Sequence, residues 1–216
     1  METLRLFVVR HGETRWSREL RFAGARDVGL TERGRLQAEA VARALADKLV
    51  ALVYASPLER TRATAAVIAA PHRLEIQLEP AFREMAFGEW EGCTRTEIAA
   101  RFPAAWAAWR ATPHLVRPAG GESLGEVAGR VSAGVAELRD VHQGEAVVLV
   151  SHAIVIRLIV LEALGLGLDR LWSVDASPAG ITEIEYHAEG GDGRGWTVVH
   201  RMNTLSHLEA VEAAAP

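Results

Sequence analysis

Cysteine, lysine and long apolar segments are scarce in this sequence. Cys93 is the only cysteine, so the chain can form neither an internal disulfide nor a zinc site built from cysteines. This fits a reducing compartment, and because the N-terminus lacks the pattern of a secretory signal, we expect a cytoplasmic protein. No apolar run approaches the roughly 20 residues that cross a bilayer. The chain has no basic run either, so we expect neither a membrane nor a nucleic acid as partner.

Arginine provides nearly all of the positive charge. Lys48 is the only lysine among the 24 basic residues, and the formal net charge is −4. An anion site must therefore be a local cluster of arginines rather than a broad basic surface. The length of 216 residues fits one domain. We expect that domain to span residues 1–208, and the Ala-rich residues 209–216 to form a loose tail.

Apolar runs alternate with helical patterns along the chain. Residues 4–9 and 146–150 are continuously apolar, which is typical of strands buried on both faces. The other expected strands are 52–55, 74–78, and the hairpin strands 181–186 and 196–202 around a glycine-rich turn at 190–193. The expected helices span about 32–48, 56–70, 124–138 and 154–164. The alternation predicts an α/β three-layer sandwich, in which a mostly parallel central sheet is flanked by helices.

The helix after Thr31 shows how the core is predicted. Thr31 is a suitable N-cap, and apolar residues recur behind it at helical spacing. The face expected to be buried consists of Leu36, Ala40, Val41, Ala44, Leu45 and Leu49.

Residues 94–119 interrupt this alternation and carry no strand signal. Helical stretches there are expected to break at Pro103, because the residue before a proline disfavours the helical conformation. Trp106 and Trp109 are expected to pack rather than to recognise a ligand. We predict a small helical lid inserted into the α/β domain.

Two of the expected strands end in a histidine. His11 follows residues 4–9 and His152 follows residues 146–150. Because ligands gather at the carboxyl ends of the strands in doubly wound sheets, we expect both histidines at one site. An imidazole attacks phosphorus only when neutral, so a nucleophilic His11 should donate its other ring nitrogen to a backbone carbonyl. His152 would hold the transferring group.

The other groups that phosphoryl transfer needs are also present. A phosphate monoester is dianionic, so its cleavage requires cations, a nucleophile in line and an acid for the leaving oxygen. Arg10, Arg60 and Arg62 carry guanidinium forks that can pair with phosphate oxygens. Glu84 could protonate the leaving alcohol and then deprotonate the attacking water. The pattern favours a small phosphorylated metabolite as substrate.

These residues lie in a series of spaced motifs. The segment Arg10-His11-Gly12-Glu13-Thr14 is similar to the defining signature of the histidine phosphatase (phosphoglycerate-mutase-like) superfamily. Later segments resemble further motifs of this family in the same order: Ser56-Pro57-Leu58 with Arg60-Thr61-Arg62, Glu84 with Phe87-Gly88 and Trp90-Glu91-Gly92, Gly120-Gly121-Glu122-Ser123, and Val150-Ser151-His152.

The resemblance covers residues 4 to about 208 and implies a phosphatase that works without a cofactor or metal. It implies that His11 is the nucleophile and that Glu84 donates and accepts protons. It also implies that Arg10, Arg60 and His152 bind the phosphate.

Several positions bear on the substrate rather than on the reaction. Where the family commonly has Asn, Gln and Gly, this sequence has Ser17, Ala23 and Ala153, and Ser17 could instead cap a helix. His207 lies in a stretch that resembles one found near the substrate in phosphatase members. The candidate substrate-binding residues are Ser17, Ala23, Gly24, Arg62, Ala153 and His207.

Two other functions stay open beside the phosphatase. Mutase relatives that depend on 2,3-bisphosphoglycerate carry a longer basic segment with a lysine after the third motif, whereas residues 94–119 contain no lysine. A silent phosphate-binding module would be expected to lose His11 or Glu84, and both are present. Phosphoserine is one of several candidate substrates and is not favoured, because Phe87 replaces a histidine found in metal-independent phosphoserine phosphatases, although the C-terminal stretch resembles theirs. An edge strand could also support a homodimer.

Overall fold

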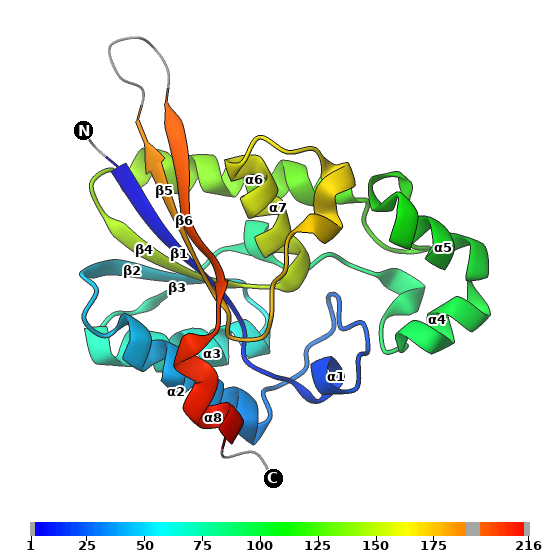
Figure 1. Ribbon diagram of the computed structural model, residues 1–216, viewed down its shortest axis with the longest axis horizontal. Helices are drawn as coiled ribbons and strands as arrows, with labels where there is room; N and C mark the ends of the chain where they lie inside the picture. The colour runs from blue at the N-terminus through cyan, green and yellow to red at the C-terminus, as the bar shows by residue number, and fades with distance from the viewer. Residues whose placement is uncertain (1–2, 189–194, 214–216) are drawn as a thin grey trace.

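One six-stranded sheet organises the computed structural model, which describes residues 3–188 and 195–213 (Figure 1). Its strands are β1 (Thr3–Arg10), β2 (Val50–Ala55), β3 (Ile76–Leu78), β4 (Ala146–Ser151), β5 (Ile181–His187) and β6 (Trp196–Thr204). They lie in the order β3-β2-β4-β1-β5-β6. The first four are parallel to one another, whereas β5 and β6 form an antiparallel extension. The predicted mostly parallel sheet is confirmed; the expected turn at 190–193 lies outside the described residues.

Helices cover both faces of this sheet (Figure 1). On one face lie α2 (Glu32–Leu45), α3 (Glu59–Ala69) and α8 (Glu209–Ala213), and on the other lie α6 (Leu124–Val141) and α7 (Ala153–Ala163). Beside them are α1 (Arg15–Arg18) and the lid helices α4 (Arg95–Arg101) and α5 (Pro103–Ala111). Short 3-10 helices span 70–72, 80–82, 88–90, 113–115, 168–173 and 206–208. None of the helices described is long and apolar enough to cross a membrane.

Strand β1 is buried on both faces, which explains its continuous apolar sequence. Leu4, Leu6 and Val8 pack into the core formed with α6 and α7. Phe7 and Val9 point to the opposite face and pack into the core formed with α2 and α3. All five side chains are at most 2% exposed, so both cores are anchored on this strand.

The lid helices meet at the predicted break. Pro103 begins α5 directly after Phe102, which ends α4, and a capping box of Thr94 and Glu97 starts α4. Trp109 is buried and packs edge-to-face on Phe87 and Trp90 at centroid distances of 5.7 and 5.9 Å. These aromatic contacts attach the lid to the α/β domain.

Helix α2 differs from the prediction in where it ends and in which of its residues are buried. It ends at Leu45, and Leu36 and Leu49 are 44% and 94% exposed instead of buried. Ala44 is also exposed. The buried face instead contains the small residues Gly34, Ala38 and Ala42 and the polar Gln37, along with Ala40, Val41 and Leu45. The helix packs most closely against α3, and small side chains permit that approach.

Two further boundaries shift for local reasons. Helix α3 begins at Glu59 with Leu58 as N-cap, because the Ser56 hydroxyl is used elsewhere, in a hydrogen bond with His152. Residues 209–213 form α8 rather than part of a loose tail, since Val211 is buried against α2 and Glu212 pairs with Arg33. Residues 214–216 lie outside the described part of the chain.

The loop after β1 lies in backbone contact with the start of α2, and a glycine on each side permits this contact. A Cβ at Gly12 would overlap the carbonyl oxygen of Gly34, and a Cβ at Gly34 would overlap that of Glu13. Both obstacles are backbone atoms, which cannot rotate away. The loop that follows His11 therefore depends on two glycines without a positive φ at either one.

We expect Gly34→Ala to lower the free energy of unfolding by about 1–3 kcal/mol, because overpacking against rigid backbone forces the loop and the helix apart. The matched control is Gly129→Ala in α6, where no atom lies within 4 Å of the added Cβ. That variant should gain about 0.5–1 kcal/mol, since alanine favours a helix interior over glycine. Urea unfolding measures both, and equal stabilities would contradict the steric argument.

Candidate active site

Two neighbouring strands deliver the two predicted histidines together. β1 and β4 are parallel, Arg10 pairs with Ser151 in register, and the His11 amide donates to the Ser151 carbonyl at 3.0 Å. The next residue of each strand is a histidine, and the rings of His11 and His152 meet edge to face with centroids 5.3 Å apart. Both side chains are buried.

The hydrogen bonding of His11 sets its tautomer. Its Nδ1 lies 2.8 Å from the carbonyl oxygen of Gly12, which can only accept, so Nδ1 carries the proton and Nε2 keeps a lone pair. Burial lowers the pKa of His11 well below its ordinary value, and the nearby charges of Arg60 and Arg10 lower it further. His11 is therefore a neutral imidazole with one free nitrogen, as a nucleophile requires.

His152 is held by Arg60 and Ser56. The Arg60 Nε donates to Nδ1 of His152 at 3.2 Å, and Nε2 of the same ring lies 2.8 Å from the Ser56 hydroxyl. Burial, followed by the charge of Arg60, lowers the pKa of His152 well below its ordinary value. Arg60 also donates to the carbonyls of Gly24 and Arg26, both at 2.8 Å. Its guanidinium is thereby fixed beside the two rings.

Arg10 is the second cation at this site. Its Nη1 donates to the Ala176 carbonyl at 2.6 Å, and its buried Nε has no hydrogen-bond partner among the residues described. Burial lowers the pKa of Arg10 to about 10, so it remains charged at neutral pH. Arg10 can therefore donate to an anion without giving up its bond to Ala176.

Glu84 is the carboxyl group of the site. It is 9% exposed, and its Oε1 accepts a hydrogen bond from the Met85 amide at 3.0 Å. Burial raises the pKa of Glu84, although the charge of Arg60 opposes the rise. The protonated carboxyl is favoured to a higher pH than in water, which suits a general acid.

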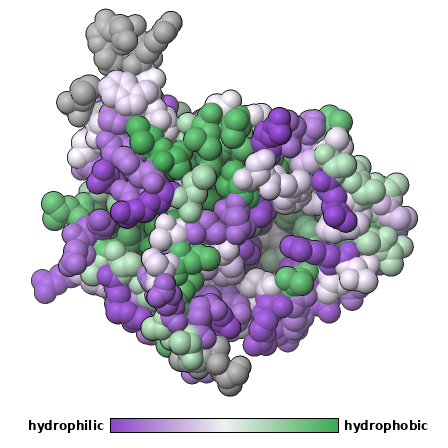
Figure 2. Space-filling model, in the orientation of Figure 1, coloured by the Kyte–Doolittle hydropathy of each residue, from purple (hydrophilic) through white to green (hydrophobic). Residues whose placement is uncertain are grey.

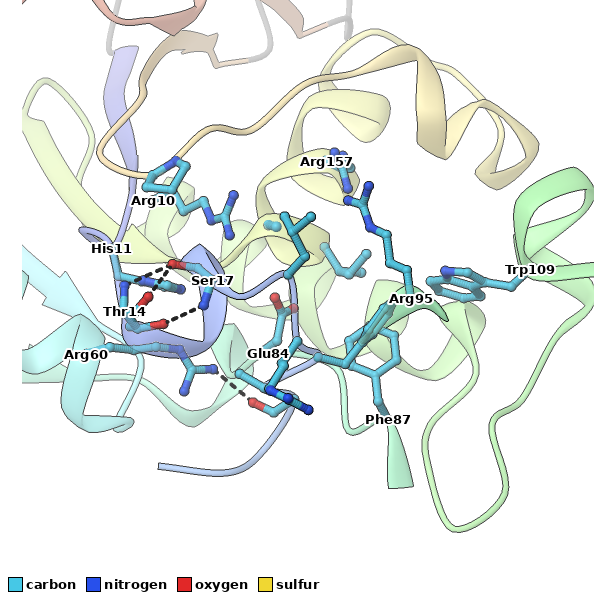
Figure 3. A pocket seen from close by; sticks show the side chains of 18 of the residues that line it. Arg10, His11, Thr14, Ser17, Arg60, Glu84, Phe87, Arg95, Trp109 and Arg157 are labelled. Carbon is cyan, nitrogen blue, oxygen red and sulfur yellow. Dashed lines mark hydrogen bonds between the residues drawn. The ribbon is translucent and has the colours of Figure 1, made fainter. Parts of the chain in front are cut away.

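These groups line one pocket of about 610 Å³, which Figure 3 shows from close by. In the orientation of Figure 1, the space-filling view shows the surface hollowed right of centre, with hydrophilic side chains along the rim (Figure 2). The structure brings eight of the eleven candidate residues to the pocket lining: Arg10, His11, Ser17, Ala23, Gly24, Arg60, Glu84 and Ala153. His152 lies behind this lining, in contact with His11 and Arg60.

Ser17 lines the pocket with its hydroxyl already engaged, and two other substrate-binding candidates, Arg62 and His207, do not line it. The Ser17 hydroxyl donates to the Thr14 carbonyl and accepts from the Thr14 amide, both at 2.9 Å, within the capping box of α1. Arg62 is exposed and does not line the pocket, because it lies on the far side of α3 from Arg60. His207 contacts the Ala179 carbonyl at 3.0 Å and does not line the pocket.

Sequence reasoning missed four arginines of the pocket: Arg21, Arg95, Arg110 and Arg157. Arg95 and Arg110 come from the lid helices, which were expected to contribute aromatic side chains. Arg157 lies one helical turn after Ala153 on α7, and both line the pocket. That i, i+4 spacing from a motif residue is the signal that could have identified Arg157.

The backbone that carries Glu84 is clamped by Arg130 of α6. Its Nη1 donates to the carbonyls of Ala81 and Arg83, both at 2.7 Å, and its Nη2 donates to that of Glu84 at 3.3 Å. The same guanidinium bonds both carboxylate oxygens of Glu122, each at 3.1 Å, and Glu122 accepts from the Ala86 amide at 2.8 Å. This pair holds the segment on both sides of Glu84.

Comparison with known proteins gives consistent relatives. A sequence profile of the histidine phosphatase superfamily (branch 1) matches residues 6–199. Phosphoserine phosphatase 1 of Hydrogenobacter thermophilus is 33% identical over 205 residues, which is 95% of this chain and 94% of that relative. The probable phosphoglycerate mutase GpmB of an Enterobacter species is 33% identical over 213 residues, 96% of each chain. A solved structure of mycobacterial glucosyl-3-phosphoglycerate phosphatase Rv2419c with VO3 is 30% identical, with a TM-score of 0.84 over 93% of this chain and 98% of that one.

We expect Arg130→Gln to lower the free energy of unfolding by about 2–4 kcal/mol, because it leaves Glu122 without its cation and three carbonyls without their donor. Arg139→Gln on the same helix is the matched control. Within the described residues Arg139 makes no hydrogen bond or ion pair, and its guanidinium lies 5.3 Å from the centroid of the Tyr186 ring, so its loss should cost about 1 kcal/mol or less. Urea unfolding distinguishes the two, and similar losses would show that Arg130 clamps nothing.

Proposed function

The chain belongs to the histidine phosphatase superfamily, and we propose that it is a phosphatase that hydrolyses small phosphorylated metabolites through a phosphohistidine on His11. The observation that carries this proposal is the neutral His11, whose Nδ1 is committed to the Gly12 carbonyl while Nε2 is free. Arg10 and Arg60 supply positive charge for the phosphoryl oxygens, and Glu84 supplies the proton. The relatives named as phosphatases support this function.

In the first step, the Nε2 lone pair of His11 attacks phosphorus. A bond forms between Nε2 and phosphorus as the ester bond between phosphorus and oxygen breaks, and the leaving oxygen takes the proton of Glu84. The imidazole becomes positively charged, and the hydrogen bond from Nδ1 to the Gly12 carbonyl stabilises that charge. Arg10 and Arg60 stabilise the negative charge on the phosphoryl oxygens.

In the second step, water releases the phosphoryl group. Glu84, now a carboxylate, accepts a proton from the attacking water as the new bond between oxygen and phosphorus forms. The bond between Nε2 and phosphorus breaks and its electron pair returns to Nε2. Inorganic phosphate leaves, and both His11 and Glu84 are back in their starting protonation states.

We expect His11→Asn to abolish phosphate release from phosphomonoesters, because no other group can form the covalent intermediate. The wild type should release phosphate in the presence of a metal chelator and should form an alkali-stable phosphoprotein, which the variant should lack. His200→Asn, an exposed histidine of β6, is the matched control and should behave as the wild type.

Loss of activity on chelation would contradict the metal-independent reaction. Isomerisation of phosphoglycerate without net phosphate release would instead make the chain a mutase, so transfer is measured beside hydrolysis. Absence of both phosphate release and isomerisation would favour a phosphate-binding module without catalytic activity.

For Glu84→Gln we expect turnover of an alkyl phosphate to fall about 100- to 10,000-fold, since the alkoxide then leaves without a proton. Release of nitrophenolate from p-nitrophenyl phosphate in the first turnover should slow much less, because nitrophenolate needs no proton and the later step, in which Glu84 is the base, has not yet occurred. In the wild type, alkyl phosphate turnover should decline as the pH rises through the raised pKa of Glu84, where its acid form is lost. Phosphate release across the pH range measures this limb, and equal slowing of first-turnover alcohol release from the two esters would refute the assignment.

A further inference from the structure

The pocket carries more positive charge than one phosphoryl group uses. Its lining contains one carboxylate, Glu84, and six arginines: Arg10, Arg21, Arg60, Arg95, Arg110 and Arg157. Arg10 and Arg60 lie beside the histidines, and Arg21 is paired with Glu19 and Glu97. The other three, Arg95, Arg110 and Arg157, come from the lid helices and from α7.

Arg157 is held in a fixed orientation. Its Nε donates to the Val174 carbonyl at 2.8 Å, and its guanidinium stacks over the Trp172 ring at 5.1 Å from the centroid. The nearest carboxylate, that of Asp175, is 3.8 Å away and largely exposed, so it neutralises Arg157 only in part. Burial lowers the pKa of Arg157, and the charge of Arg95 lowers it further.

Arg95 faces Arg157 from the lid. It is the first residue of α4 and is exposed, and within the described part of the chain its guanidinium forms no ion pair or hydrogen bond. Figure 3 shows the two guanidinium groups extending toward one another across the pocket. Like charges in this arrangement repel, and an anion placed between them would remove the repulsion.

The location of this pair relates it to the leaving group. The pKa of Arg157 responds to the charge of Glu84, the group that protonates the leaving oxygen in the proposed reaction. Figure 3 shows Glu84 between His11 and Arg60 on one side and Arg95 and Arg157 on the other. A group bound by Arg95 and Arg157 would therefore belong to the alcohol part of the substrate rather than to the phosphate that is transferred.

We propose that Arg95 and Arg157 bind a second anionic group of the substrate, a carboxylate or a second phosphate on the alcohol that leaves. This inference rests on the proposed phosphatase function and specifies its substrate class. Both guanidinium groups present paired N–H donors, which match the oxygens of either anion. A phosphomonoester with a neutral alcohol would leave the repulsion between the two arginines in place.

The test compares Arg95→Gln with the wild type on matched substrates: 3-phosphoglycerate and O-phosphoserine, fructose 1,6-bisphosphate, and glycerol 2-phosphate, whose alcohol is uncharged. We expect KM to rise about 10-fold for the substrates whose second anion is bound, equivalent to about 1.4 kcal/mol, and to change less than about 2-fold for glycerol 2-phosphate. Arg101→Gln, at the other end of α4, does not line the pocket and should change neither. If KM rises only for 3-phosphoglycerate and O-phosphoserine, the second anion is a carboxylate. If it rises only for fructose 1,6-bisphosphate, the second anion is a phosphate.

An equal change on charged and uncharged alcohols, or no change, would overturn the second-anion site while leaving the phosphatase intact. The two proposals are separated further by binding of 3-phosphoglycerate and fructose 1,6-bisphosphate to His11→Asn, measured by calorimetry with and without Arg95→Gln. Weaker binding in the double variant would support the anion site even if the wild type hydrolysed nothing. Unchanged binding of both ligands would refute it.

Discussion

The parallel pairing of β1 with β4 is the constraint on which the site depends. Because the two strands run in the same direction and in register, each delivers a histidine one residue beyond the pair Arg10 and Ser151. The hydrogen bond from the His11 amide to the Ser151 carbonyl extends the ladder to that point. The two cores packed on the faces of β1 therefore also set the distance between the imidazoles.

Burial then sets the protonation states. Removal from water disfavours every charged form, so it lowers the pKa of His11 and His152 and raises that of Glu84. The arginines stay charged because the unperturbed guanidinium pKa is far above neutrality. Burial thus favours the neutral form of both histidines and the acid form of Glu84, beside arginines that stay charged, and this combination suits the proposed phosphoryl transfer to His11.

The sequence patterns predicted the strand ends and the helix break at Pro103 well, because apolar runs and proline act locally. They could not separate Arg60 from Arg62. Two residues along a helix correspond to about 200° of rotation, so once α3 begins at Glu59, Arg60 enters the pocket and Arg62 faces solvent. Leu36 and Leu49 had the right spacing for a core, yet the face of α2 that packs against α3 carries smaller residues, and both leucines are exposed. Arg95 depends on how the lid folds over, which no local pattern encodes.

The structural role of the motif at residues 120–123 is visible only in the contacts that Glu122 makes in the folded chain. Glu122 binds the Ala86 amide and Arg130, and Arg130 in turn binds the carbonyls on both sides of residue 84. A Cβ on Gly121 would meet the Ala86 carbonyl at 2.5 Å, so the two segments also touch through backbone. In the proposed reaction Glu84 first donates and then accepts a proton, which requires a backbone that holds the carboxyl in place between the two steps. The clamp supplies that rigidity from outside the pocket, where it cannot compete with the substrate for Glu84.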